Sequence, residues 1–325
     1  MPASIKLLAL SSTTRKIYQR IPGGPWSEFP VQPQLGVSMG RALVGLPNGS
    51  IICWDGSALV FKHWDPATST WIARTLAGQP DRGWGVGVPV GENSAVVVAL
   101  NGSYTAAFNG DTNTWAYLGC PIGNVSSSDV AALSLTDIWV AGRTVGGVNF
   151  AWHWDGSSWV DYHPITPALF NGGINNIPVA VATAGGAVFF IIGNTMNVSN
   201  VVRFRAGVWA ASGNFTTGLL DIWPLDPATF FFSSCVEGDY RLFKGSDGEV
   251  SGGNNFVFTS VQQQNMAVQY PGSIVKTIMG LDSQRVYVAG LTAVARIWET
   301  LDGATWTLTT GYPSDNCSSL AAWVE

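Results

Sequence analysis

The segment FKHWDPATSTW, residues 61–71, combines an aromatic strand, a turn led by aspartate, and a second strand that ends in tryptophan. Three further segments follow the same plan: AAFNGDTNTW (106–115), AWHWDGSSW (151–159) and VRFRAGVW (202–209). Their final tryptophans stand at positions 71, 115, 159 and 209. A repeat of roughly 45 residues that is built from short strands has the size of one four-stranded unit in a radial array of β-sheets.

Weaker copies of this segment end at Trp26, Val250 and Trp306, which brings the number of repeats to seven. The copy that ends at Trp159 divides into four apolar runs, at 130–133, 137–142, 149–154 and 158–162. Turn residues such as Asp155-Gly156 separate the runs, and no segment of helical period with capping residues interrupts them. The chain is therefore predicted to be an all-β, seven-bladed β-propeller with four antiparallel strands per blade.

The two ends of the chain complement one another. Residues 5–29 supply a second, third and fourth strand (IKLLALSS, TRKIYQR and PWSEF) but no first strand. We expect SSLAAWVE, residues 318–325, to be that first strand and to close the ring by joining the N-terminal blade, because an open ring leaves an unpaired edge. Residues 1–325 then form a single domain, whose first blade combines 1–30 with 314–325 and whose other blades cover 31–77, 78–122, 123–166, 167–215, 216–262 and 263–313.

Composition excludes several classes of protein. Charged residues make up 11% and hydrophobic residues 46% of the chain, which excludes intrinsic disorder and disfavours a helix-rich enzyme. Sixteen Lys and Arg residues against 21 Asp and Glu residues form no basic stripe, so no nucleic-acid partner is expected. The N-terminal apolar run is too short for a secretory leader or a membrane span, so we expect synthesis in the cytoplasm without signal peptide or membrane insertion.

The residues capable of chemistry form no recognisable constellation. The four cysteines (Cys53, Cys120, Cys235 and Cys317) have no CxxC spacing and are interpreted as free, mostly buried thiols rather than zinc ligands. His63 and His153 share one repeat position, which favours a structural role. The acids of the repeat turns (Asp65, Asp155, Asp247 and Asp302) are interpreted as turn formers. We therefore expect no catalytic residue, no metal and no cofactor.

HWDPATSTW and NGDTNTW resemble the kelch repeat, although a single glycine (Gly142, Gly193 or Gly290) stands where kelch repeats carry two. DIWVAG with HWDGSSW looks like a Trp-Asp-Gly repeat of bacterial propellers, and TLDGATW resembles a shortened Asp-box. These resemblances imply a propeller of the galactose-oxidase central-domain type or the Asp-box type, and they specify no activity. The copper site of kelch-like oxidases and the arginine cluster of sialidases have no counterpart that we recognise in this sequence.

Two long segments are predicted to be connecting loops: HPITPALFNGGINNIP (163–178) and SGGNNFVFTSVQQQNMAVQYPGS (251–273). Their amides and aromatic rings suit either a sugar or a protein surface. The predicted binding residues are Phe170, Asn171, Asn175, Asn176, Gln263, Asn265 and Tyr270, joined by Arg82 and Trp84 from another inter-blade turn. The alternative is that these are ordinary loops, with Phe256 and Phe258 in a strand core.

A complete propeller without a catalytic constellation favours a non-enzymatic binding or assembly module. The expected context is a virion, as a phage tail or capsid component that recognises the host surface or docks proteins. Its partners would be other virion proteins, or a glycan or protein of the host cell surface. Two alternatives stay open: a free carbohydrate-binding lectin, and a sialidase-like or lyase-like enzyme that processes glycans.

Overall fold

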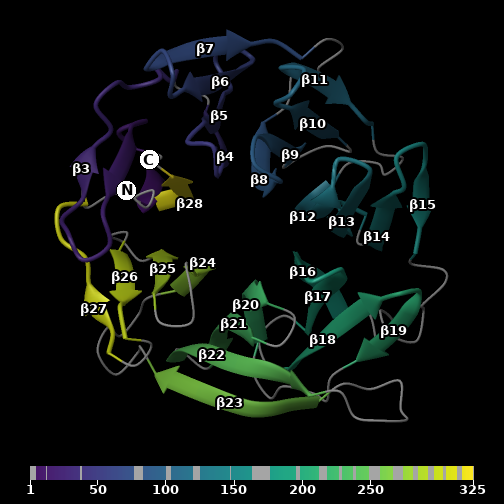
Figure 1. The fold of residues 1–325 in the computed structure, drawn as a ribbon. Helices are drawn as coiled ribbons and strands as arrows, with labels where there is room; N and C mark the ends of the chain where they lie inside the picture. Colours follow the sequence, from purple (N-terminus) through teal and green to yellow (C-terminus); the bar gives the residue numbers. More distant parts are fainter. Residues whose placement is uncertain are drawn as a thin grey trace.

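The computed structural model describes residues 5–11, 13–36, 39–76, 83–99, 104–119, 125–146, 148–162, 176–194, 198–211, 218–226, 229–236, 239–248, 257–265, 274–280, 285–291, 296–302, 305–312 and 317–324. Every regular element among them is a β-strand, and the strands form seven antiparallel sheets of four. In Figure 1 the sheets stand radially around a centre, with the first strand of each innermost and the fourth strand outermost. The predicted all-β propeller with four-stranded antiparallel blades is confirmed.

We number the blades along the chain and give the strands of each from the centre outward. Blade 1 contains β28 (Cys317–Val324), β1 (Ile5–Ser11), β2 (Ile17–Arg20) and β3 (Ser27–Glu28). Blade 2 contains β4 (Met39–Gly45), β5 (Ile51–Asp55), β6 (Val60–Asp65) and β7 (Thr70–Arg74), and blade 3 contains β8 (Trp84–Val90), β9 (Ser94–Ala99), β10 (Thr105–Asn109) and β11 (Thr114–Tyr117). Blade 4 contains β12 (Val125–Ser134), β13 (Asp137–Thr144), β14 (Asn149–Trp154) and β15 (Trp159–Asp161).

The last three blades follow the same plan. Blade 5 contains β16 (Asn176–Ala184), β17 (Ala187–Asn194), β18 (Val198–Arg205) and β19 (Val208–Ala211). Blade 6 contains β20 (Gly218–Asp226), β21 (Thr229–Val236), β22 (Asp239–Gly248) and β23 (Val257–Asn265). Blade 7 contains β24 (Ile274–Gly280), β25 (Val286–Leu291), β26 (Arg296–Thr300) and β27 (Thr307–Leu308).

The two ends of the chain meet in blade 1. β28 pairs antiparallel with β1, with Ile5 opposite Val324 and Leu10 opposite Ser319, and Figure 1 shows both termini beside this sheet. The indole Nε1 of Trp323 donates to the carbonyl oxygen of Gly49 in blade 2. The C-terminal strand is therefore bonded to its own blade and also to the next one.

The second strands form the hydrophobic core. All six residues of β9 and all five of β5 are buried, because neighbouring blades cover both faces of a second strand. We call the packed layer between two neighbouring blades a seam. Successive residues of a second strand face the two seams in turn: Ile51 packs in the seam with blade 1, and Ile52 packs in the seam with blade 3. This explains why these strands are continuous apolar runs rather than alternating ones.

Three of the repeat tryptophans are hydrogen-bonded to the blade before their own. The Nε1 of Trp71 donates to the carbonyl oxygen of Val31 at 2.6 Å, and Trp159 bonds in the same way to Leu118 at 3.0 Å. Trp26 closes the corresponding seam between blades 7 and 1 through Thr309 Oγ1 at 2.9 Å. The tryptophan that marks the repeat in the sequence is thus an inter-blade contact.

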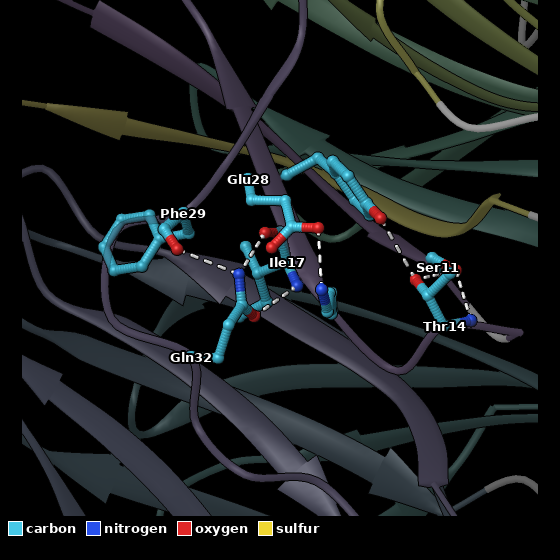
Figure 2. Close-up of polar contacts among 8 residues, drawn as sticks. Ser11, Thr14, Ile17, Glu28, Phe29 and Gln32 are labelled. Carbon is cyan, nitrogen blue, oxygen red and sulfur yellow. Dashed lines mark hydrogen bonds and ion pairs between the residues drawn. The ribbon is translucent and has the colours of Figure 1, made fainter.

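Blade 1 has a short outer strand that a side chain extends. β3 has two residues, and beyond its end the carboxamide of Gln32 takes the place of a strand backbone. Its Oε1 accepts from the N–H of Ile17 and its Nε2 donates to the carbonyl oxygen of Ile17, both at 3.0 Å (Figure 2). The same Nε2 also donates to the carbonyl oxygen of Phe29. Gln32 thus gives the N–H of Ile17 an acceptor and adds a second donor to the Ile17 carbonyl oxygen, which also accepts from the N–H of Phe29 at 2.9 Å.

The interpretation of residues 251–273 as one loop is wrong. Within this segment β23 pairs with β22 from Gly248 opposite Val257 to Arg241 opposite Asn265. Blade 6 therefore extends to Asn265, past the predicted boundary at 262. Asp247, expected in a turn, lies in β22 opposite Phe258. The sequence suggested otherwise because the blade 6 copy of the repeat has no terminal tryptophan to mark its fourth strand.

Candidate functional site

The alternation of strand direction gives the ring two distinct faces. The hairpins between second and third strands emerge together with the blade-to-blade connections on one face, which we call the connection face. The hairpins between first and second strands and between third and fourth strands emerge on the other, the turn face. The two long segments proposed for binding begin or end on the connection face.

Four of the predicted binding residues fall in described segments. Asn176 is the first residue of β16, opposite Asn194, and so lies at the connection face of blade 5. Asn265 is the last residue of β23, at the same face of blade 6 but on the outermost strand, with Gln263 two residues before it. The structure therefore places Asn176 and Asn265 on one face but on different blades. The others (Phe170, Asn171, Asn175, Tyr270 and Arg82) lie outside the described residues.

Trp84 is a correction, because it cannot serve as an exposed binding ring. It begins β8 and is fully buried in the seam between blades 2 and 3. Its ring lies 5.5 Å from that of Phe61 and 6.3 Å from that of Trp54, measured between centroids. An inner strand starts at this residue, so its side chain turns into the packed seam and not toward solvent.

The connection face carries an exposed apolar feature that the repeat pattern does not reveal. The hairpin between β13 and β14 presents Val145 and Val148, whose exposed fractions are 70% and 60%. Two hydrogen bonds hold the hairpin: Thr144 N–H to the carbonyl oxygen of Val148 at 2.8 Å, and Val148 N–H to Thr144 Oγ1 at 3.0 Å. The two valines thus sit in water on a hydrogen-bonded hairpin, in the blade that precedes Asn176.

The turn face of blade 4 holds a polar pair that the sequence analysis missed. Asp137 Oδ1 lies 2.9 Å from His153 Nε2 and accepts at 2.9 Å from the Nε1 of Trp139. The rings of Trp139 and His153 stack with centroids 4.3 Å apart and an interplanar angle of 17°. An ionised carboxylate can only accept, so Nε2 carries a proton, and the imidazole is held in one orientation.

His63 provides a comparison within the same chain. It occupies the equivalent place in blade 2, opposite Ile52 where His153 stands opposite Trp139. Among the described residues no carboxylate bonds it, and neither of its ring nitrogens has a hydrogen-bond partner there. Burial, with a smaller contribution from the charge of Arg74, lowers the pKa of His63. The sequence signal that distinguishes His153 is the D-x-W motif of residues 137–139, where blade 2 has Ser50 and Ile52.

Aspartates also tie two of the seams near the inner strands. Asp129 accepts from the N–H of Val130 through Oδ1 and from the N–H of Val181, in blade 5, through Oδ2, both at 2.9 Å. Asp221 does the same with Ile222 and with Ile278 of blade 7, at 2.9 and 3.0 Å. Burial raises the pKa of Asp129 to about 6, against the lowering effect of its two N–H donors.

The aspartates of the repeat turns and the cysteines are the remaining side chains considered for chemistry. Their contacts in the structure are mainly those of turns and of the buried core. Asp65 and Asp155 accept from backbone N–H groups two residues ahead, and Asp302 accepts from that of Thr305, as expected for turn formers. Cys53 and Cys317 are buried, Cys317 Sγ donates to the carbonyl oxygen of Ser319, and burial raises the pKa of the Cys53 thiol. Within the described ranges no three His, Cys, Asp or Glu residues gather in a way that suits a metal ion. The described part of the chain also holds no helix that is long and apolar enough to span a membrane.

No protein-family model and no curated protein matches the chain. Among solved structures it is similar to YCF48 from Cyanidioschyzon merolae, at 12% identity over 90% of each chain with a TM-score of 0.61. It is also similar to virginiamycin B lyase from Staphylococcus aureus, at 14% identity over 88% of this chain and 91% of that one, with a TM-score of 0.61. A structure of YCF48 bound to D1 peptide matches over 92% of both chains, at 13% identity with a TM-score of 0.57.

These identities support a shared fold and no closer relationship. The matched structures include one that binds a peptide and one that is a lyase, so they do not decide between a binding protein and an enzyme. The kelch and Asp-box resemblances find no support in the comparisons. The conclusion that the comparisons carry is that this chain has the fold of a β-propeller.

Proposed function

We propose that this protein is a docking module that binds an extended segment of a partner protein on its connection face, at blades 4 and 5. The observation that carries the proposal is the pair of exposed valines, Val145 and Val148, on a hairpin held by its own hydrogen bonds. Apolar side chains on a hairpin that is already hydrogen-bonded can bury area on binding with less ordering of the backbone. A propeller of similar fold has been solved with a peptide bound, which makes this use of the fold physically reasonable.

The next blade brings two residues of polar type to the same face. Asn176 and Asn194 pair at the ends of β16 and β17, and asparagine is a residue type that both donates and accepts hydrogen bonds. An apolar contact beside amide groups is the usual composition of a protein-binding surface, whose centre is apolar and whose rim is polar.

The test uses a library of displayed peptides selected on the immobilised full chain, followed by calorimetry of the enriched peptides. Replacing both valines (Val145→Asp and Val148→Asp) should weaken binding by about tenfold or more, since the central contacts of an interface dominate its affinity. Val208→Asp is the matched control, because Val208 is 57% exposed but lies on the turn face. Binding that survives the double substitution, or is lost equally in the control, would place the docking site elsewhere.

A second candidate function is acid–base catalysis by His153 and Asp137. The observation that favours it is the 2.9 Å contact that orients the imidazole, an arrangement used to hold a general base. A virginiamycin B lyase variant with a histidine replaced by alanine, solved with quinupristin, is described as catalytically inactive. Incubation of this protein with virginiamycin B and with quinupristin, followed by mass spectrometry, tests the idea. Turnover that disappears in His153→Ala would establish it, and unchanged substrates would eliminate this lyase activity.

The predictions of a virion component, of a lectin and of a sialidase-like enzyme are each tested by a separate experiment. A phage tail or capsid component should co-sediment with virus particles, and its partners should be other virion proteins or a host-surface glycan or protein. A lectin should bind defined sugars on a glycan array without changing them. A sialidase-like enzyme should release products from the same array, an outcome that would contradict a purely non-enzymatic role.

A further inference from the structure

The outermost strands of this propeller are unequal in length. Six of them have two to five residues: β3, β7, β11, β15, β19 and β27. β23 has nine residues and runs along the rim of blade 6 in Figure 1. Its sheet ends there, so among the described residues β22 is its one ladder partner. Proteins commonly keep exposed edge strands short because a long edge can pair with another strand.

β23 also lacks two of the usual protections of an edge, charged side chains and proline. Its sequence, VFTSVQQQN, contains no charged residue and no proline. A bulge between Phe258 and Val261 interrupts its register with β22, since these residues face Asp247 and Gly245. The part from Val261 to Asn265 is regular, and each residue there faces one residue of β22. The regular part of this edge is therefore an amide-rich stretch of five residues.

We infer that two copies of this chain associate through antiparallel pairing of Val261–Asn265 with the same segment of the second copy. A two-fold axis at Gln263 sets Gln263 opposite itself, Gln262 opposite Gln264, and Val261 opposite Asn265. Alternate residues of an antiparallel edge direct both their N–H and their C=O outward. The outward groups of one copy can therefore form backbone hydrogen bonds with those of the other copy. The product is a continuous eight-stranded sheet that spans two propellers.

Charge favours a second copy over an unrelated partner. In a two-fold arrangement every charged residue of the edge would meet its own counterpart or a close neighbour, and like charges placed opposite one another are destabilising. The segment Val261–Asn265 contains no charged residue, so pairing it with its own copy brings no like charges together. The nearest charged residues of the sheet, Arg241 and Lys244, belong to β22 and lie one strand further in. A charged foreign peptide would find no complementary charge on β23 itself.

The geometry also sets the strength of the contact. Five paired residues bury less area than a stable interface normally does, so the dimer should be weak and dependent on concentration. Each dimer would carry two connection faces, which would strengthen attachment to a partner present in several copies. The inference does not depend on the proposed docking function, because β23 is remote in sequence from the valine hairpin and can be tested without any ligand.

Sedimentation velocity of the full chain over about a hundredfold range of concentration provides the test, because weak dimers dissociate on dilution. The wild-type protein should shift from monomer toward dimer as the concentration rises. Gln263→Lys should raise the dissociation constant about fivefold, since two lysines then meet at the axis. Ala116→Lys, at an exposed position of the outer strand β11, is the matched control and should leave the constant unchanged.

A charge-swap experiment separates a lost interface from a damaged fold. Gln263→Glu alone should associate as poorly as Gln263→Lys, but an equimolar mixture of the two should form a heterodimer at least as readily as the wild type. Recovery on mixing requires both variants to be folded and to meet at residue 263. Any of three results would overturn the inference. The wild-type protein could stay monomeric at every concentration, the dissociation constant of the dimer could be unchanged by both substitutions, or the mixture of the two variants could fail to associate.

Discussion

The indole Nε1 of Trp159 donates a hydrogen bond of 3.0 Å to the carbonyl oxygen of Leu118, across the seam between blades 4 and 3. The equivalent tryptophan of blade 3, Trp115, stacks on Phe61 of blade 2 with centroids 4.1 Å apart, but its buried Nε1 has no hydrogen-bond partner in the part of the chain that the structure describes. The repeat thus keeps the ring in both places and the hydrogen bond in one.

This difference predicts unequal effects of the same substitution. Trp159→Phe should lower the free energy of unfolding by about 0.5–1.5 kcal/mol more than Trp115→Phe, because one change leaves a carbonyl unbonded and the other removes an unsatisfied donor. Both changes remove the same volume, so the comparison isolates the hydrogen bond. Urea unfolding followed by fluorescence gives both values. Equal losses would mean that the Leu118 contact adds nothing to stability.

The seam between blade 2 and the C-terminal strand leaves no room at Gly45. A Cβ added there would collide with the carbonyl oxygen of Ala322 in β28, which is backbone and cannot rotate away. Gly45→Ala should therefore destabilise the protein by about 1–3 kcal/mol. Gly83→Ala is the control, since nothing lies within 4 Å of its added methyl group. Thermal melting should separate the two variants, and equal melting temperatures would contradict the tight approach of β28.

Removal of residues 318–325 tests whether the same strand holds the ring together. Trp323 and Ala321 are buried against blade 2, and a large buried side chain contributes roughly 1.5–3 kcal/mol. The deletion also leaves the backbone N–H and C=O groups along the edge of β1 unpaired, and an unpaired edge promotes aggregation. We expect insoluble protein in the pellet after expression. A soluble, monomeric truncated protein would show that blade 1 does not need its innermost strand, β28.

Arg20 and Glu299 join blades 1 and 7 in an ion pair of 2.6 Å, with side chains exposed by 2% and 7%. Glu299→Ala leaves the guanidinium buried without its partner and should cost about 3–5 kcal/mol of unfolding free energy. Replacing both residues (Arg20→Met with Glu299→Leu) should cost less than Glu299→Ala alone, because no charge is then stranded. Glu28→Ala breaks the exposed pair with Lys16 and should cost at most about 1 kcal/mol. A double variant less stable than the single one would contradict this account.

The carboxyl group of Asp129 should make stability depend on pH in a defined window. Its pKa is raised to about 6 from an ordinary value of 3.8, chiefly by burial. Between these two values the folded state binds more protons than the unfolded state, so its contribution to the free energy of unfolding falls as the pH rises. The stability difference between the wild type and Asp129→Ala should thus change across this window and level off above it. A carboxyl resonance that titrates near 3.8, or a slope of opposite sign, would refute the raised pKa.

Much of the fold could be predicted because its signals are local. Trp71, Trp115 and Trp159 each lie in a fourth strand, as the repeat predicted. Asp155 bonds the N–H groups of Ser157 and Ser158, which lower its pKa, and such a turn forms whatever surrounds it. β23 was missed because it lacks that marker tryptophan. Only its pairing with β22 shows that VFTSVQQQN is a strand.

The candidate site was less predictable because it depends on which strands come together. Asp137 and His153 are 16 residues apart and meet because β13 and β14 pair in the register that sets Trp139 opposite His153. The exposure of Val145 and Val148 follows from a hairpin tip that no neighbouring blade covers in the described structure. A sequence gives residue types at such places, but not their neighbours or their access to water.

The amino-acid sequence by itself determined the period, the strand-forming runs and the acidic turns, since these arise from interactions between residues close along the chain. The tertiary structure decided that Trp84 is buried in a seam and that Asp129 reaches the N–H of Val181, 52 residues away. The physical reason is that a seam is made of two blades at once. Which side chains fill it depends on how the sheets are set around the ring.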